Sequence, residues 1–286
     1  MSLNFDWLNF IDISGPFLSE PVLNDKLPHG LDSLNSKIAA QLRTDYNEWR
    51  EAIEEEDPYL KEIHEAWIQE VLCEVLEYDD VVLRREGLPE NLNVELPEYG
   101  IILKPDMVLS EPINPDATLM LLSVFEPNHD LNVPFKTNGL VASAKDRMIS
   151  MLKASECSVG LVTNGEMWML VFADDGSISS TATWHARIFS QERDTLRAFS
   201  SLLGIYRFTG PATDRIGSLL QQSAEHQGNV TEELGAQVST AIEVLMRALD
   251  RADQDRNREL LKDIEPKELY EARFNFDDAA CCGSLC

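Results

Sequence analysis

The sequence lacks the features that mark membrane proteins and secreted proteins. No stretch approaches the ~20 consecutive apolar residues that a helix needs to span a bilayer. The first residues include Asp6 and Asp12 and form no basic segment ahead of an apolar run, so we expect no signal peptide. These absences predict a cytoplasmic protein that does not bind membranes.

Positively charged residues are scarce. The 286 residues include 24 Lys and Arg against 50 Asp and Glu, which gives a formal net charge of -26. Because such a surface repels the phosphates of nucleic acids, we expect weak DNA binding, or none, by this chain alone. Solubility is the simplest explanation of the excess acid, and a basic partner protein is the alternative.

The cysteines and histidines form no recognisable catalytic or metal-binding motif. Cys73 and Cys157 fall in apolar patterns that are typical of buried thiols in a reduced cytoplasm, whereas Cys281, Cys282 and Cys286 lie at the C-terminus. The five histidines are scattered, and none lies in a His-Glu-x-x-His or nucleophile-elbow motif. We therefore expect neither a metal site nor Ser-His-Asp catalysis.

The sequence is organised around two apolar runs between residues 99 and 127. Both are rich in Ile, Val, Leu and Met, and the polar segment 111–117 between them contains two prolines and an asparagine. This pattern predicts two adjacent strands joined by a loop.

Asp106 follows Pro105 at the head of the first of these strands. Nucleases of the PD-(D/E)xK superfamily place their first metal-binding aspartate in a similar setting, and a Glu-x-Lys on the next strand completes their site. Here the next strand offers Ser123-Val124-Phe125. One carboxylate cannot hold a catalytic Mg²⁺, and no lysine is placed to assist the attacking water. The pattern resembles a degenerate nuclease scaffold without nuclease chemistry.

Other acidic residues are vestigial candidates for the same site. Glu65, Glu70 and Glu74 lie on a helix expected before the strands, and Glu126 follows the second strand. For any one helix glutamate, a solvated position is the simpler interpretation. The Glu-x-x-His spacing to His129 is that of a metal pair, but it lies beside a proline and off any helix, so we interpret His129 as a loop residue.

The spacing of apolar residues predicts two helices before these strands. The first covers residues 32–56 and is capped by Asp32 or Ser33, and the second begins at Asp57-Pro58 and runs to Leu76.

Further elements are expected after the strands. Ser143 is expected to cap a helix, and Asn164-Gly165 is typical of a type I′ turn in a β-hairpin. Asp174-Asp175-Gly176 is expected to turn the chain into another strand around Ala182-Thr183-Trp184. This order predicts an α+β domain built on a central mixed sheet, as a restriction-endonuclease-like fold requires.

We divide the chain into four segments. Residues 1–29 are expected to form an extended arm whose aromatic side chains pack on the body, and residues 30–190 the degenerate nuclease-like domain. Residues 191–272 are expected to form a helical connector, interrupted at Gly228-Asn229, with an apolar stripe that needs a partner. Residues 273–286 form an aberrant tail.

Three blocks of sequence, 160–171, 195–204 and 244–253, resemble a known family. They are similar to the N-terminal region of Type IIG-like restriction–modification DNA adenine methyltransferases, which include the methylase of DISARM-type phage-defence systems. The resemblance runs from about residue 80 to Ala272. It implies a degenerate nuclease-like domain and a helical connector ahead of a methyltransferase domain, and partners among the other subunits of a defence or restriction system.

The sequence departs from that family after Glu271-Ala272. The Gly-rich loop for S-adenosylmethionine and the Asn-Pro-Pro-Tyr-type motif of the methyltransferase domain are not present. A one-nucleotide shift of the tail 273–286 can be read as the apolar helix that the family has there. We therefore interpret the chain as a truncated N-terminal piece that needs no cofactor of its own, S-adenosylmethionine being used only by the missing domain.

Three functions remain open at this point. The preferred one is a non-catalytic module of a restriction–modification or phage-defence methyltransferase that acts in DNA engagement or partner docking. The first alternative is an active Mg²⁺-dependent nuclease that uses Asp106, one of the helix glutamates such as Glu70, and Glu126. The second alternative is a stand-alone acidic interaction or regulatory protein.

Overall fold

The computed structural model describes residues 5–174 and 178–255. The chain divides into two units, of which the first runs to Gln227 and the second begins at Gly228. The described residues of the second unit are helical and belong to α8 (Ile216–Asp255). No helix in the described ranges is long and apolar enough to cross a membrane.

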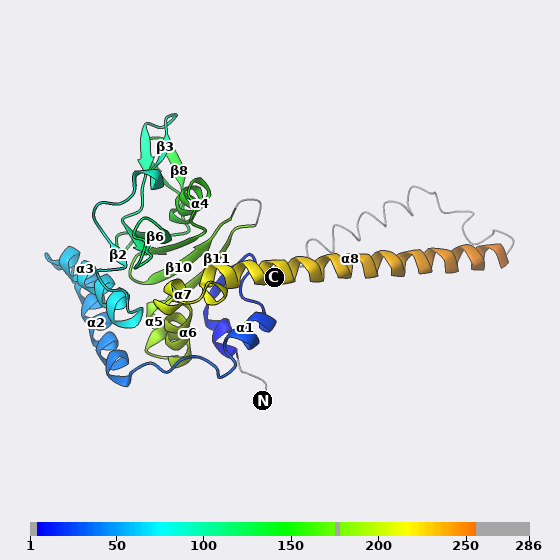
Figure 1. The fold of residues 1–286 in the computed structure, drawn as a ribbon, viewed down its shortest axis with the longest axis horizontal. Coiled ribbons are helices and arrows are strands. Elements are labelled where there is room, and N and C mark those ends of the chain that lie inside the picture. The colour runs from blue at the N-terminus through cyan, green and yellow to red at the C-terminus, as the bar shows by residue number, and fades with distance from the viewer. Residues whose placement is uncertain (1–4, 175–177, 256–286) are drawn as a thin grey trace. The chain divides into compact units, whose positions relative to one another are not determined.

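A mixed sheet forms the centre of the first unit (Figure 1). Each strand is antiparallel to its neighbours except β6 and β9, which are parallel and are separated in the chain by helix α4 (Ala144–Ala154). In spatial order, the seven strands of this sheet within the described residues are β1 (Asp12–Ser14), β11 (Ser180–His185), β10 (Met167–Phe172), β9 (Val159–Thr163), β6 (Thr118–Val124), β5 (Met107–Ser110) and β2 (Leu83–Arg84). The prediction of an α+β fold with a mixed sheet is confirmed.

Both faces of this sheet are covered, which explains why the central strands read as continuous apolar runs. Alternate residues of β5 and β6 point to opposite faces: Val108 and Leu121 contact the core under α4, whereas Leu109 and Leu122 belong to the larger core on the other face. That larger core is built with α2 (Ser36–Glu54), α3 (Leu60–Glu70) and α6 (Arg193–Leu203). Two small hairpins lie outside the main sheet, β3 (Val94–Leu96) with β4 (Ile101–Leu103) and β7 (Phe135–Thr137) with β8 (Leu140–Ala142).

Helix α4 begins where the sequence predicts. The Ser143 hydroxyl accepts a hydrogen bond from the Asp146 N–H (3.1 Å), and the Asp146 carboxylate accepts one from the Ser143 N–H (3.3 Å). This reciprocal pair satisfies two N–H groups that a helix start otherwise leaves unpaired.

The N-terminal segment is part of the sheet, which corrects the predicted extended arm. It contains the 3₁₀ helix η1 (Asp6–Phe10), strand β1 and α1 (Glu20–Lys26). Strand β1 pairs with β11 from Asp12 to Ser14, and the His185 imidazole lies 2.7 Å from the Asp12 carboxylate. The aromatic contacts were predicted correctly, since Trp7 and Phe17 are buried.

The first two long helices begin later than predicted. Helix α2 begins after Asn35, whose side-chain oxygen accepts the Lys37 N–H (3.0 Å), and the predicted cap Asp32 lies in the preceding connection, where its N–H donates to Ser201 Oγ (2.9 Å). Helix α3 begins at Leu60, and Asp57 instead caps a turn through the Tyr59 N–H (2.7 Å). A π-helical turn, η2 (Val71–Val75), completes the second predicted helix.

The β9–β10 hairpin is confirmed, but its predicted type I′ turn is wrong. That turn needs positive φ at both central residues, whereas of the pair only Gly165 has one, at +87°. Asn164 instead uses its side-chain oxygen to accept the N–H groups of Glu166 (3.0 Å) and Met167 (2.7 Å). The predicted turn at Asp174-Asp175-Gly176 lies partly outside the described residues.

The segment after residue 190 packs differently from the predicted connector. Helix α6 lies in the core of the first unit and contacts the short helices α5 (Ala186–Phe189) and α7 (Tyr206–Thr209), and η4 (Ala212–Asp214) follows α7 in the chain. The observed division therefore follows Gln227 rather than residue 190. Helix α8 continues through Gly228-Asn229 without the predicted interruption, since a single glycine costs a helix only about 1 kcal/mol. The predicted tail at 273–286 lies outside the described residues.

Candidate functional site

Asp106 lies at the edge where β5 begins and β6 ends. Its N–H donates to the Leu122 carbonyl (2.9 Å), and its carboxylate accepts the Val124 N–H (2.8 Å). The β5–β6 ladder begins with Met107 opposite Leu122, so Asp106 lies just before it and is bound to the residues on either side of Ser123. The sequence prediction that Asp106 heads one of two adjacent strands is confirmed.

The two positions that would complete a nuclease motif hold a hydroxyl and an aromatic ring. Ser123 is buried. The ring of Phe125 stacks on His129 with centroids 4.9 Å apart, and both rings contact Phe135 edge-on. The Arg147 guanidinium lies over the Phe135 ring, 3.9 Å from its centroid. Phe125, His129 and Phe135 therefore form one aromatic cluster.

The carboxyl group of Asp106 is not held in its ionised form by a strong cationic partner. Asp106 is exposed, but the partial removal of water around its carboxyl group raises its pKa, and this outweighs the lowering by the Val124 N–H and the charge of Lys104.

His64 fixes the end of β6 from helix α3. The Trp49 indole N–H donates to His64 Nδ1 (3.1 Å), so the proton of the neutral ring lies on Nε2, which donates to the Phe125 carbonyl (3.0 Å). Both ring nitrogens are therefore occupied, and His64 is a structural residue rather than a metal ligand.

Burial lowers the pKa of His64, while the Phe125 carbonyl and the charges of Glu126 and Glu65 act in the opposite direction. The folded protein therefore favours the neutral ring, and its stability falls as the pH drops below about 6.5, where the unfolded chain takes up the proton. We expect the difference in unfolding free energy between the wild type and His64→Gln to shrink by up to about 1.4 kcal/mol per pH unit below that point. Urea denaturation from pH 8 to pH 5.5 measures it, and a difference that stays constant would contradict this assignment.

The other predicted acids are not gathered around Asp106. Glu126 is exposed just beyond the end of β6. Glu70 ends helix α3, where burial and the negative charges of Asp45 and Glu74 raise its pKa. Among the described residues, no group of three or more His, Cys, Asp or Glu side chains is placed to hold a metal ion.

The two described cysteines are free thiols. Cys157 is buried, which raises its pKa to about 11, and Cys73 is half-buried beside the side-chain amide of Gln69 (2.7 Å). A thiol whose pKa is raised has little thiolate at neutral pH, so neither is activated as a nucleophile. Cys281, Cys282 and Cys286 lie outside the described residues.

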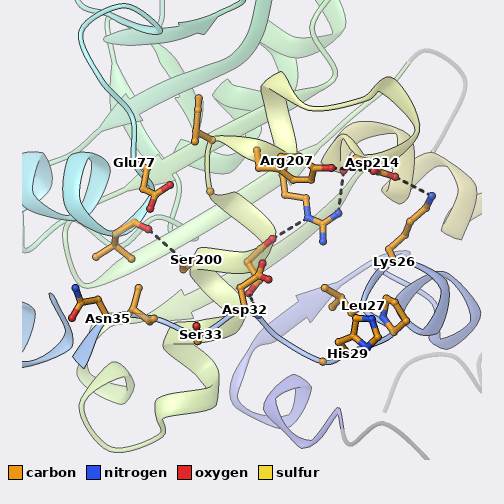
Figure 2. Close-up of a pocket in the computed structure, with 18 of the residues that line it drawn as sticks. Lys26, Leu27, His29, Asp32, Ser33, Asn35, Glu77, Ser200, Arg207 and Asp214 are labelled. Atoms are coloured by element: carbon orange, nitrogen blue, oxygen red, sulfur yellow. Dashed lines mark hydrogen bonds and ion pairs between the residues drawn. The ribbon is translucent and has the colours of Figure 1, made fainter. Parts of the chain in front are cut away.

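A second site lies elsewhere in the first unit and was missed in the sequence. It is a cavity of about 870 Å³ beside α6 and α7, and its wall includes the buried Arg207 (Figure 2). An isolated arginine between two short helical patterns carries no signal of burial, so sequence reasoning had no means of finding it.

Comparisons with protein-family models, with curated proteins and with solved structures found no match to this chain.

Proposed function

We propose that this chain is a non-catalytic module of a restriction–modification or phage-defence DNA adenine methyltransferase, built on a degenerate restriction-endonuclease-like core. The observation that carries the proposal is the way Asp106 is bound to the end of β6. Its N–H and its carboxylate bind Leu122 and Val124, on either side of Ser123, and Phe125 lies in an aromatic cluster, so the second acid and the lysine of a PD-(D/E)xK site are both replaced.

The order of elements around Asp106 supports the same proposal. Helix α3 precedes the antiparallel strands β2, β5 and β6, and helix α4 then leads to β9, which is parallel to β6. A helix, antiparallel strands, a helix and a returning parallel strand give the mixed sheet that such a nuclease core requires.

Charge favours partner docking over DNA engagement as the role of the module. The formal net charge of -26 opposes contact with phosphates, whereas a basic protein surface would be attracted. We therefore propose docking to another subunit or to the methyltransferase itself. In this family S-adenosylmethionine serves the methyltransferase domain, so the docking role requires no methyl donor on the residues described.

A cleavage assay tests the absence of catalysis. Plasmid DNA is incubated with wild-type protein, Asp106→Ala or Asp116→Ala in Mg²⁺ or Mn²⁺. We expect all three to leave the DNA at the level of the protein-free control, because a single carboxylate does not hold a catalytic metal ion. A mobility-shift gel of the same mixtures shows whether DNA is bound without being cut.

Asp116 is the matched control because it is an exposed aspartate on the loop joining the other ends of β5 and β6. Metal-dependent cleavage by the wild type and Asp116→Ala that is abolished in Asp106→Ala would establish an active nuclease and refute the proposal.

A further inference from the structure

The cavity beside α6 is built from three separate parts of the first unit. Its walls are residues 25–38, which cover the end of α1, the connection and the start of α2; the residues at and just after the end of the π-helical turn η2; and the segment from Ser200 to Asp214. Its volume of about 870 Å³ lies within the range of small-molecule sites. It lies apart from Asp106, which is not among its lining residues.

Arg207 is a buried charged residue that lines this cavity, and only 6% of its surface is exposed. Its Nε–H donates to the Ser201 carbonyl (3.0 Å) and its Nη1 to the Asp214 carbonyl (3.3 Å). Figure 2 shows the guanidinium directed into the cavity between these two bonds. An arginine carries five N–H groups, so these two bonds leave others for a ligand.

No carboxylate neutralises Arg207 within the described ranges of the chain. Asp214 contributes only its backbone carbonyl to Arg207, since its carboxylate pairs with Lys26 at 3.0 Å. That pairing raises the pKa of Lys26 and lowers the pKa of Asp214. A buried guanidinium without a counter-charge is costly, and a carboxylate or phosphate matches its planar donors.

The walls around Arg207 are polar and fixed in place. The Ser200 hydroxyl donates to the Val75 carbonyl (3.2 Å) and keeps lone pairs free to accept. The Ser201 hydroxyl accepts the Asp32 N–H (2.9 Å), which leaves its own proton to donate. Arg197 donates to the Asp32 carbonyl (2.9 Å) and so ties the α1–α2 connection to α6.

Acidic side chains also line the cavity, and they restrict what it accepts. Asp32 and Glu77 are exposed, and both lie on its wall. They repel ligands with several negative charges and attract amine or hydroxyl donors. The favoured ligand therefore carries one anionic group for Arg207 and hydrogen-bond donors on the rest of its body.

From this arrangement we propose that the cavity binds a small molecule through a single carboxylate or phosphate group paired with the free edge of the Arg207 guanidinium. The site is independent of the Asp106 region and does not depend on the function proposed above.

Titration with two simple anions tests the proposal. Sodium acetate and sodium phosphate are added separately at constant ionic strength, and binding is followed by the arginine Nε–H signals in nuclear magnetic resonance spectra. We expect one of the two anions to shift the Arg207 signal saturably in the millimolar range, and its identity tells whether the site prefers carboxylate or phosphate.

Two variants probe the site from different sides. Arg207→Lys keeps the charge but removes the planar donors, and we expect binding, measured by calorimetry, to weaken at least about tenfold. Ser33→Glu adds a negative charge on the exposed wall without touching a bond of Arg207, and we expect a similar loss. Because Ser33 is exposed, this second variant keeps the test valid if Arg207→Lys fails to fold.

Ser150→Glu is the matched control, since it adds the same charge at an exposed position of α4. We expect it to bind the anion as the wild type does. Saturation by neither anion up to about 50 mM, or equal binding by Ser33→Glu and Ser150→Glu, would overturn the proposal.

Discussion

Replacing Gly165 with alanine is expected to lower the free energy of unfolding by about 3 to 4 kcal/mol. Gly165 has a φ of +87°, and a Cβ built there would lie 2.8 Å from Trp49 and 3.1 Å from both His64 and Trp67. These neighbours are large and buried, so they cannot move aside cheaply. The Gly165 carbonyl also accepts the indole N–H of Trp67 (2.9 Å) and that of Trp168 (3.1 Å), so a shift of the turn disturbs both bonds.

Gly100→Ala separates crowding from backbone strain. Gly100 also has a positive φ, +62°, but a Cβ there meets nothing within 4 Å. We expect this variant to cost only about 1 kcal/mol, the strain of the left-handed conformation alone. Chemical denaturation of both variants measures the difference, and equal losses would mean that the aromatic side chains do not press on the turn.

Replacing Phe199 with alanine is expected to destabilise the entire first unit by about 3 to 5 kcal/mol. Phe199 is fully buried on α6, and its ring centroid lies 5.7 Å from Trp168, 5.7 Å from Trp184 and 5.1 Å from Phe189. Removing the ring leaves a cavity between α6 and strands β10 and β11, so the sheet and the helix lose stability together. Tryptophan fluorescence and circular dichroism during urea unfolding should report one shared transition at lower denaturant.

Phe10→Ala is the matched control because Phe10 is 39% exposed. We expect it to cost no more than about 1 kcal/mol. If Phe199→Ala lost helical signal at low urea while the tryptophan signal of the sheet stayed unchanged, α6 would belong to a separate connector, as the sequence alone predicts.

The elements with strong local signals were predictable. The capping pair at Ser143 and the apolar strands on either side of Asn164-Gly165 are encoded within a few residues, and the structure has both. The turn type was missed because Asn164 satisfies the loop with its side chain rather than with a positive φ. Competition between side chain and backbone for the same N–H groups is not visible in residue order.

Elements that depend on distant partners were not predictable. The sequence near Ile13 does not indicate that it pairs with Ala182, so the N-terminal segment read as an arm. The apolar positions of α6 are equally compatible with a connector and with a core helix, since periodicity shows that a face is buried without showing against what.

The candidate site also combines features that the sequence predicts with features that depend on distant partners. The Pro105-Asp106 setting and the replacement of the expected acid by Ser123 are visible in the sequence, but the hydrogen bonds from Asp106 to Leu122 and Val124 depend on how the two strands pair. Arg207 has no sequence signal because its importance comes from its burial and from the absence of a carboxylate partner among the residues that the structure describes, and these properties arise only where three segments meet.

The pairing of β1 with β11, which are the first and the last strand of the main sheet in chain order, has a consequence for folding during synthesis. Residue 12 leaves the ribosome long before its partner at residue 183, so β1 waits unpaired while the middle of the domain forms. Closing so long a loop costs entropy before any contact compensates for it. The β1 edge of the domain is therefore completed late, after the chain has emerged beyond β11, and until then the aromatic residues near the N-terminus remain available to chaperones.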